Sequence, residues 1–256
     1  MGHAVVQFEI GAADDEPLVA FYGALFGWGL RRVSGGYTLI DTRGGGGING
    51  GIGRSRTGEA WSAFYVESDD PQGTLDRANS LGGTTVLPVT TIGAAGTMAM
   101  FNDPDGLLVG LIGPAGSADG SAPSAGSGES VDWFEILGSD PVRTQTFYAD
   151  LFGWTVDRSG IPGYAVVDTG TARGIQGGVG GGTDSRWAIV YAGVSDVDGA
   201  LSRAEQLGGS RLAAPGVSAL KNAARAALYG SADHMNTGVF RDPAGNIFGV
   251  YHKEAR

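Results

Sequence analysis

The chain has 256 residues, of which 42% are hydrophobic, and a formal net charge of −10. The hydrophobic fraction is enough for a packed core, and the negative charge disfavours nucleic acid and anionic membranes as partners. The absence of cysteine excludes disulfides, thiolate metal sites and cysteine nucleophiles. We expect a cytoplasmic protein, because no apolar run could span a bilayer and the N-terminal residues lack a signal-peptide pattern.

The first residues predict a β-α-β-β-β unit. Val5–Ile10 alternates as a strand does, with Gln7 and Glu9 on one face. A helix follows, with Asp14 as its expected N-cap and Gly27 as its end. Its apolar face carries Leu18, Phe21, Tyr22, Leu25 and Phe26. Short strands are then expected at Trp28–Val33, Gly36–Asp41 and Ile48–Gly53.

A second unit of the same kind follows. Trp61–Glu67 predicts a strand, and Asp70 caps a helix that ends at Gly82. The turn 102–106, which contains the sequence DPDG, separates the last two strands. The strands of this unit after the helix are expected at Thr84–Leu87, Thr97–Phe101 and Leu107–Ile112.

The chain then repeats itself. Val5–Trp28 returns as Val131–Trp154, with FEI, FY and LFGW each displaced by 126 positions. The DPxG turn at 103–106 returns 139 positions later, so the second half carries about 13 extra residues. We therefore predict two domains, 1–113 and 131–256.

Two segments interrupt the repeat. The stretch 114–130 is rich in Gly, Ser and Ala and predicts a flexible linker. The extra residues form an insertion at about 216–236 with a short helix-like core at Leu220–Leu228, and an insertion of this kind can act as a lid.

With both halves aligned, the chain resembles the vicinal oxygen chelate superfamily, which includes glyoxalase I, bleomycin-resistance proteins and extradiol dioxygenases. The resemblance rests on the FEI strand, the helix ending in FYxxLFGW, the LGG after the second helix and the FxDPxG turn. It is similar to tandem actinobacterial members called glyoxalase-like or hydroxylase-like. The resemblance implies an α+β fold of four βαβββ modules, paired into two cupped mixed sheets with helices outside and ligands inside the cups.

The family's metal ligands stand on the first, fifth and last strands of a half. The corresponding positions here are Gln7 and Trp133, residues near Ala63 and Ile189, and Gly110 and Gly249. Only Gln7 could bind a metal, whereas a catalytic divalent ion needs about three protein ligands. The three histidines do not fall on these positions. We therefore predict no metal and no other cofactor.

The residues at these positions favour a small-molecule site instead. Gly110 and Gly249 would leave room and bare backbone, and Trp133 places an indole where a ligand would bind. Such a cavity suits a hydrophobic, aromatic ligand. Alternatively, the aromatic side chains are core or interface packing. The other candidates for the wall are Tyr37, Tyr164, Tyr191, Tyr251 and Trp61 or Trp187.

Three residues are candidates for acid–base chemistry. Glu9 and Glu135 share the face of Gln7 and Trp133, and a carboxylate in a dry cavity can serve as general acid or base. They could equally sit at the strand end, in water or beside an arginine. His234, on the insertion, would be a general base near neutral pH or a loop histidine in solvent.

Two functions follow. The first is a metal-independent binding protein that sequesters an aromatic small molecule such as an antibiotic. The second is a metal-free tailoring enzyme, of hydroxylase, isomerase or cyclase type, acting on an aromatic polyketide-like substrate. A metal-dependent glyoxalase or dioxygenase, or an interaction module whose cups are filled by its own side chains, are further alternatives. We expect a monomer, because the internal repeat supplies the pairing that single-domain relatives obtain by dimerising.

Overall fold

The structure, a computed structural model, describes residues 3–55, 57–92, 96–113, 122–158, 160, 162–181, 186–212 and 237–253. The predicted insertion at 216–236, with His234, and residues 114–121 of the predicted linker lie outside this set. No helix among the described residues is long and apolar enough to cross a membrane.

The described residues form two eight-stranded sheets, one in each half of the sequence. In spatial order, the first sheet consists of β2 (Gly29–Arg32), β3 (Thr38–Asp41), β4 (Asn49–Arg54), β1 (Val5–Ala12), β5 (Trp61–Glu67), β8 (Leu108–Ile112), β7 (Thr97–Asn102) and β6 (Thr84–Thr91). The second consists of β10 (Thr155–Asp157), β11 (Tyr164–Asp168), β12 (Gln176–Gly181), β9 (Val131–Gly138), β13 (Trp187–Val194), β16 (Ile247–His252), β15 (Thr237–Arg241) and β14 (Ser210–Leu212).

Both sheets are mixed, because β5 and β8 pair in parallel, as do β13 and β16, while the outer strands are antiparallel. The helices are α1 (Glu16–Phe26), α2 (Pro71–Ser80), α3 (Pro141–Phe152) and α4 (Val197–Gln206), with a short 3-10 helix, η1, at Ser34–Gly36. The α+β class and the tandem arrangement predicted from the sequence are confirmed.

The helix boundaries agree with the predicted caps with one exception. Asp70 accepts a hydrogen bond from the backbone N–H of Gly73, and Gly27 ends α1 with a φ of 68°. The prediction of Asp14 as the N-cap of α1 is wrong, since Asp15 holds that position and its carboxylate instead pairs with Arg32 at 2.9 Å.

The described part of the predicted linker is anchored rather than loose. The hydroxyl of Ser124 donates to a carboxylate oxygen of Asp41 at 2.6 Å, and Ala125 forms a β-bridge with Gly44. The carbonyl of Glu129 accepts a hydrogen bond from the indole of Trp28 at 2.8 Å. Composition alone missed these contacts, because small residues allow close approach of backbones as readily as they allow freedom.

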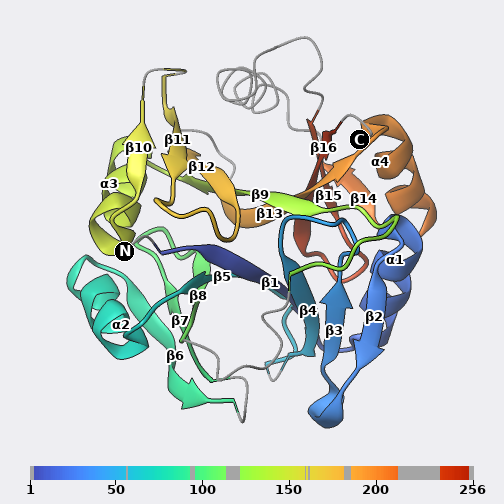
Figure 1. Cartoon of the computed structure of the whole chain (residues 1–256), viewed down its shortest axis with the longest axis horizontal. Helices are drawn as coiled ribbons and strands as arrows, with labels where there is room; N and C mark the ends of the chain where they lie inside the picture. Colours follow the sequence, from blue (N-terminus) through green and yellow to red (C-terminus); the bar gives the residue numbers. More distant parts are fainter. Residues whose placement is uncertain are drawn as a thin grey trace. The chain divides into compact units, whose positions relative to one another are not determined.

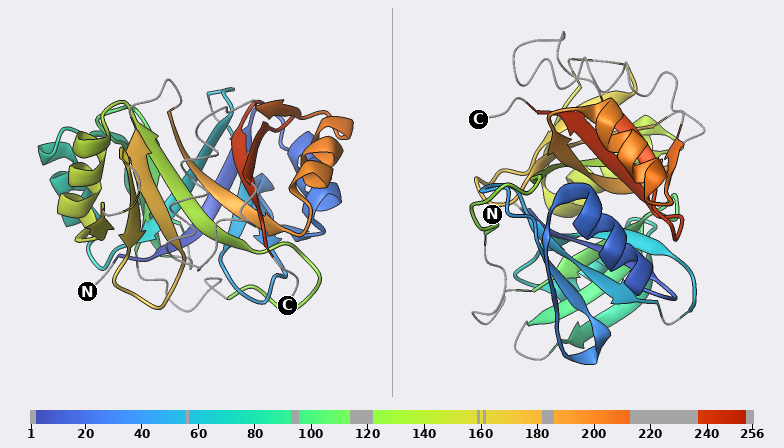
Figure 2. Two further views of the ribbon diagram at one scale, coloured as in Figure 1. Left: turned by 90° about the horizontal axis from the view of Figure 1, so that it is seen from above. Right: turned by 90° about the vertical axis from the view of Figure 1, so that its right-hand side faces the viewer.

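The chain folds into two compact units that do not follow the sequence halves. One contains Met1–Gln7, Ala63–Ser121 and Phe134–Ala188; the other contains Phe8–Ser62, Ala122–Trp133 and Ile189–Arg256. Each unit takes one helix from each half. Figures 1 and 2 show α2 beside α3 in the first unit and α1 beside α4 in the second.

A buried tyrosine–aspartate hydrogen bond holds each unit together. In the first unit, the hydroxyl of Tyr148 on α3 donates to Asp103 in the turn before β8 at 3.0 Å. In the second, Tyr22 on α1 donates to Asp242 in the turn before β16 at 3.1 Å. The repeated FY motif therefore supplies the donor and the repeated DPxG motif supplies the acceptor of this hydrogen bond. In each unit the two motifs come from different halves of the chain.

The tryptophan of each FGW motif makes a second repeated contact. Trp28 donates to the carbonyl of Glu129, and Trp154 donates to the carbonyl of His3, both at 2.8 Å. Each indole also stacks on the tyrosine of its unit, with ring centroids 5.6 Å apart for Tyr22 and Trp28. These indoles therefore fix the chain where it enters the first strand of a half.

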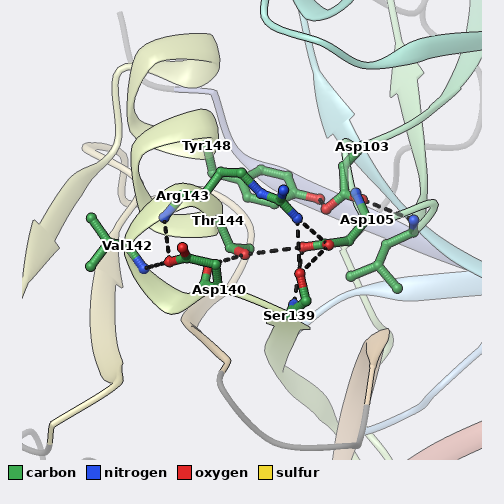
Figure 3. A network of polar contacts seen from close by, with 9 residues as sticks. Asp103, Asp105, Ser139, Asp140, Val142, Arg143, Thr144 and Tyr148 are labelled. Atoms are coloured by element: carbon green, nitrogen blue, oxygen red, sulfur yellow. Dashed lines mark hydrogen bonds and ion pairs between the residues drawn. The ribbon is translucent and has the colours of Figure 1, made fainter.

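The first unit adds a polar network that the second does not repeat. Figure 3 shows Asp105, which follows Asp103 in the turn, receiving hydrogen bonds from the backbone N–H and the hydroxyl of Ser139. The guanidinium of Arg143 pairs with the same carboxylate. Burial acts to raise the pKa of Asp105, but the bonds from Ser139 and the charge of Arg143 outweigh it and lower that pKa.

We predict that Tyr148→Phe lowers the free energy of unfolding by about 1.5–3 kcal/mol at pH 7, because it leaves a buried carboxylate oxygen without its donor. Burial, together with the nearby charge of Asp105, raises the pKa of Asp103 against its hydrogen bonds. A carboxyl group whose pKa is raised on folding stabilises the folded state most at low pH. This stabilisation is fully present below the pKa of the unfolded state, about 3.9, and is lost as pH rises through the pKa of the folded state.

Loss of the tyrosine donor raises that pKa further, so the stability deficit of Tyr148→Phe shrinks as pH falls from 7 towards 4. Urea unfolding at several pH values measures this change. Ser80→Ala is the control, since it removes an exposed hydroxyl that bonds the carbonyl of Arg77. A deficit for Tyr148→Phe that stays constant across this pH range contradicts the prediction.

Candidate ligand-binding site

The glycines at the predicted metal positions of the last strands are covered by tyrosine rings. Gly110 lies opposite Tyr65 in the β5–β8 pair, and Gly249 lies opposite Tyr191 in the β13–β16 pair. A Cβ atom added at either glycine would overlap the ring of its partner. The space that we expected these glycines to leave open is therefore taken by a tyrosine in each half. Tyr65 recurs as Tyr191 126 positions later, a signal in the repeat that could have revealed this pairing.

The remaining predicted metal positions also fail to supply a ligand set. Ala63 and Ile189 are buried apolar residues, and Trp133 is only 2% exposed. Gln7 is half-buried on β1. Across the part of the chain that the structure describes, no three His, Asp or Glu side chains gather as a metal site would require. These residues do not fit the divalent ion of the family.

Glu135 on β9 forms the centre of a buried polar group in the first unit. Its side chain is 0% exposed. One carboxylate oxygen accepts a hydrogen bond from the hydroxyl of Tyr164 at 3.2 Å, and the other accepts one from the indole N–H of Trp187 at 2.7 Å. A buried carboxylate needs such donors, because desolvation without them is costly. The three residues come from β9, β11 and β13, so the sheet itself sets their geometry.

Equivalent residue types stand at the repeat positions in the second unit. Glu9, Tyr37 and Trp61 correspond to Glu135, Tyr164 and Trp187 at offsets of 126 or 127. The hydroxyl of Tyr37 lies over Gly51, just as that of Tyr164 lies over Gly178, and a Cβ atom at either glycine would overlap it. Glu9 is 8% exposed, and Tyr37 and Trp61 are half-buried. Each half thus carries a carboxylate, a tyrosine and a tryptophan at matching positions.

Tyr251 lies in a different cluster, which sequence reasoning missed. Its hydroxyl donates to Asp132 at 2.5 Å, and the ammonium of Lys253 donates to Ser130 at 2.7 Å while pairing with Asp132. None of these side chains recurs in the first half, where Ala4, Val6, Ile112 and Pro114 hold the equivalent positions. The repeat therefore offered no signal for this cluster. The ligand-binding roles of Tyr251, Tyr191 and Trp133 stay predictions.

Residues 4–111 match the model of the Glyoxalase/Bleomycin resistance protein/Dioxygenase superfamily. The first half of the chain is a member of this superfamily. The whole chain has the same fold as the Mn(II)-bound glyoxalase from Novosphingobium aromaticivorans, with 14% identity, a TM-score of 0.66, and coverage of 98% of this chain and 83% of that one. The predicted superfamily is thereby confirmed for residues 4–111, and the predicted fold is confirmed for the whole chain.

Further relatives extend the likeness over both halves. The 2,2′,3-trihydroxybiphenyl 1,2-dioxygenase from Sphingomonas wittichii strain RW1 aligns at 16% identity and a TM-score of 0.59, covering 99% of this chain and 91% of the dioxygenase. The anthracycline biosynthesis protein DnrV of Streptomyces peucetius is 27% identical over 231 residues, which is 81% of this chain and 82% of DnrV. The anthracycline biosynthesis protein DauV of Streptomyces sp. (strain C5) is equally similar.

We predict that Trp187→Phe lowers the free energy of unfolding by about 1–3 kcal/mol, because it leaves one oxygen of the fully buried Glu135 without its indole donor. Urea unfolding measures the loss. The double variant Trp187→Phe with Glu135→Gln removes the buried charge but keeps an oxygen that accepts from the hydroxyl of Tyr164, and it should recover part of the loss. Equal losses in the single and double variants would contradict the assigned hydrogen bond.

We also predict that Gly249→Ala destabilises the fold by about 1–3 kcal/mol, since the added methyl group overlaps the ring of Tyr191. Gly46→Ala is the matched control, because nothing lies within 4 Å of a Cβ atom added there. The midpoint of urea unfolding compares the two variants. A midpoint for Gly249→Ala at or above that of Gly46→Ala would show that the ring does not occupy this space.

Proposed function

We propose that this protein is a metal-independent binding protein for a planar, aromatic small molecule of the polyketide type. The observation that carries the proposal is the carboxylate of Glu135 bonded to a tyrosine and a tryptophan, with the same three residue types at the matching positions of the first half. Aromatic side chains favour flat aromatic ligands, and a carboxylate accepts hydrogen bonds from their phenolic hydroxyls. Sequestration of an antibiotic or a biosynthetic intermediate is the role that this chemistry fits.

Two findings support the metal-independent part. The positions where the superfamily holds its metal carry Gly110, Gly249 and Trp133, none of which offers a nitrogen or oxygen ligand from a side chain suited to a divalent ion. The relatives DnrV and DauV are named for anthracycline biosynthesis, which favours an aromatic polyketide over the small substrates of a glyoxalase. We also propose that the chain acts as a monomer in the cytoplasm.

The second candidate is a tailoring enzyme that acts on the same class of molecule without a metal. The name of DnrV favours it, because a biosynthesis protein can transform its ligand as well as bind it. A nearly buried carboxylate would then move a proton to or from the substrate. In this proposal the first residue to test is Glu9, which is 8% exposed.

Binding of a commercial anthracycline to protein treated with a chelator tests the proposal. We expect the same dissociation constant, measured from quenching of anthracycline fluorescence, before and after metal removal, with elemental analysis confirming that no metal remains. Loss of binding on chelation, restored by one divalent ion, would contradict the proposal. Mass spectrometry of the recovered ligand separates the two candidates, because only the enzyme changes its mass or retention time.

A further inference from the structure

The two repeated carboxylate groups differ in what surrounds them. Three residues share one face of the first strand of each half, and they are Gln7, Glu9 and Gly11 on β1 but Trp133, Glu135 and Leu137 on β9. The β9 residues are 2%, 0% and 3% exposed, respectively. The second half therefore flanks its carboxylate with two large apolar side chains, where the first half has an amide and a glycine.

The aromatic partners show the same difference. In the first unit, Tyr164 and Trp187 are 4% and 6% exposed, so every member of the group around Glu135 is buried. In the second unit, Tyr37 and Trp61 are half-buried, and Glu9 is 8% exposed. One copy is fully buried, whereas the tyrosine and the tryptophan of the other are partly exposed.

The exchange of leucine for glycine accounts for part of this difference. A Cβ atom added at Gly180 would lie 3.3 Å from Cδ2 of Leu137 and 2.8 Å from the ring of Tyr164, so this part of the first unit is filled. The equivalent atom at Gly53 would lie 3.6 Å from both Glu9 and Tyr37, which is an ordinary contact. At Gly11, where the leucine would stand, the indole of Trp61 lies against the backbone instead.

We propose that Glu9, Tyr37 and Trp61 contact the ligand, whereas the group around Glu135 is a closed structural copy that binds none. This inference rests on the proposed function and names the half that performs it. The ligand class is a planar aromatic molecule with a phenolic hydroxyl. The hydroxyl donates to the carboxylate of Glu9, which can accept several hydrogen bonds, while the ring packs on the accessible part of Trp61.

Matched variants of the two copies test the assignment in the full chain. The probe is 1,4-dihydroxyanthraquinone, with unsubstituted anthraquinone as the partner that lacks the hydroxyls. We expect Trp61→Phe and Glu9→Gln each to weaken binding of the dihydroxy compound about tenfold with little change in melting temperature. Trp187→Phe should lower the melting temperature by several degrees and leave the dissociation constant unchanged, measured well below that temperature.

The hydroxyl-free probe isolates the role of Glu9. Anthraquinone should bind the wild type about tenfold more weakly than the dihydroxy compound, and Glu9→Gln should erase most of that difference. Failure of the wild type to bind either compound or an anthracycline overturns the proposed function and this inference together. If the wild type binds, but Trp187→Phe weakens that binding and Trp61→Phe does not, only the inference is overturned.

Discussion

A buried hydrogen bond between a tyrosine on a helix and an aspartate in a distant turn is the interaction on which each compact unit depends. Asp103 is 4% exposed and Asp242 is 3% exposed, so neither carboxylate can rely on water. One oxygen of each accepts backbone N–H groups of its own turn, and the other accepts the tyrosine hydroxyl. Since a buried carboxylate must find donors, the helix from the other half stabilises each turn through its tyrosine, to which Asn246 adds a second donor for Asp242.

The same logic makes the fold a cooperative product of both halves. Each unit takes its helix pair and its tyrosine–aspartate bond from both halves of the sequence, and its tryptophan–carbonyl bond joins residues more than 100 positions apart. With this framework repeated in both units, the residues of the sheet faces are free to diverge. They have done so at Gln7 against Trp133 and at Gly11 against Leu137.

Two of the positions where the resemblance to the superfamily predicted metal ligands are covered by aromatic rings in this chain. Gly110 and Gly249 stand at these predicted positions, under the rings of Tyr65 and Tyr191. A glycine beneath a tyrosine packs well but offers no ligand atom from its side chain. The chemistry left to the sheet is that of a carboxylate with aromatic neighbours, which suits recognition of an aromatic molecule through stacking and hydrogen bonding.

The sequence by itself determined the repeat, the βαβββ modules, the cap at Asp70 and the superfamily, because these depend on local patterns and on a constant offset. The choice of partners depended on the tertiary structure. Composition favoured a loose segment at 114–130, yet Ser124 bonds Asp41, and the space expected beside Gly249 holds Tyr191. Contacts between residues more than 80 positions apart leave no local signature, so the pairing of Tyr22 with Asp242 emerged only from the folded chain. The same holds for the difference in burial between Glu9 and Glu135, because burial depends on neighbours from several strands.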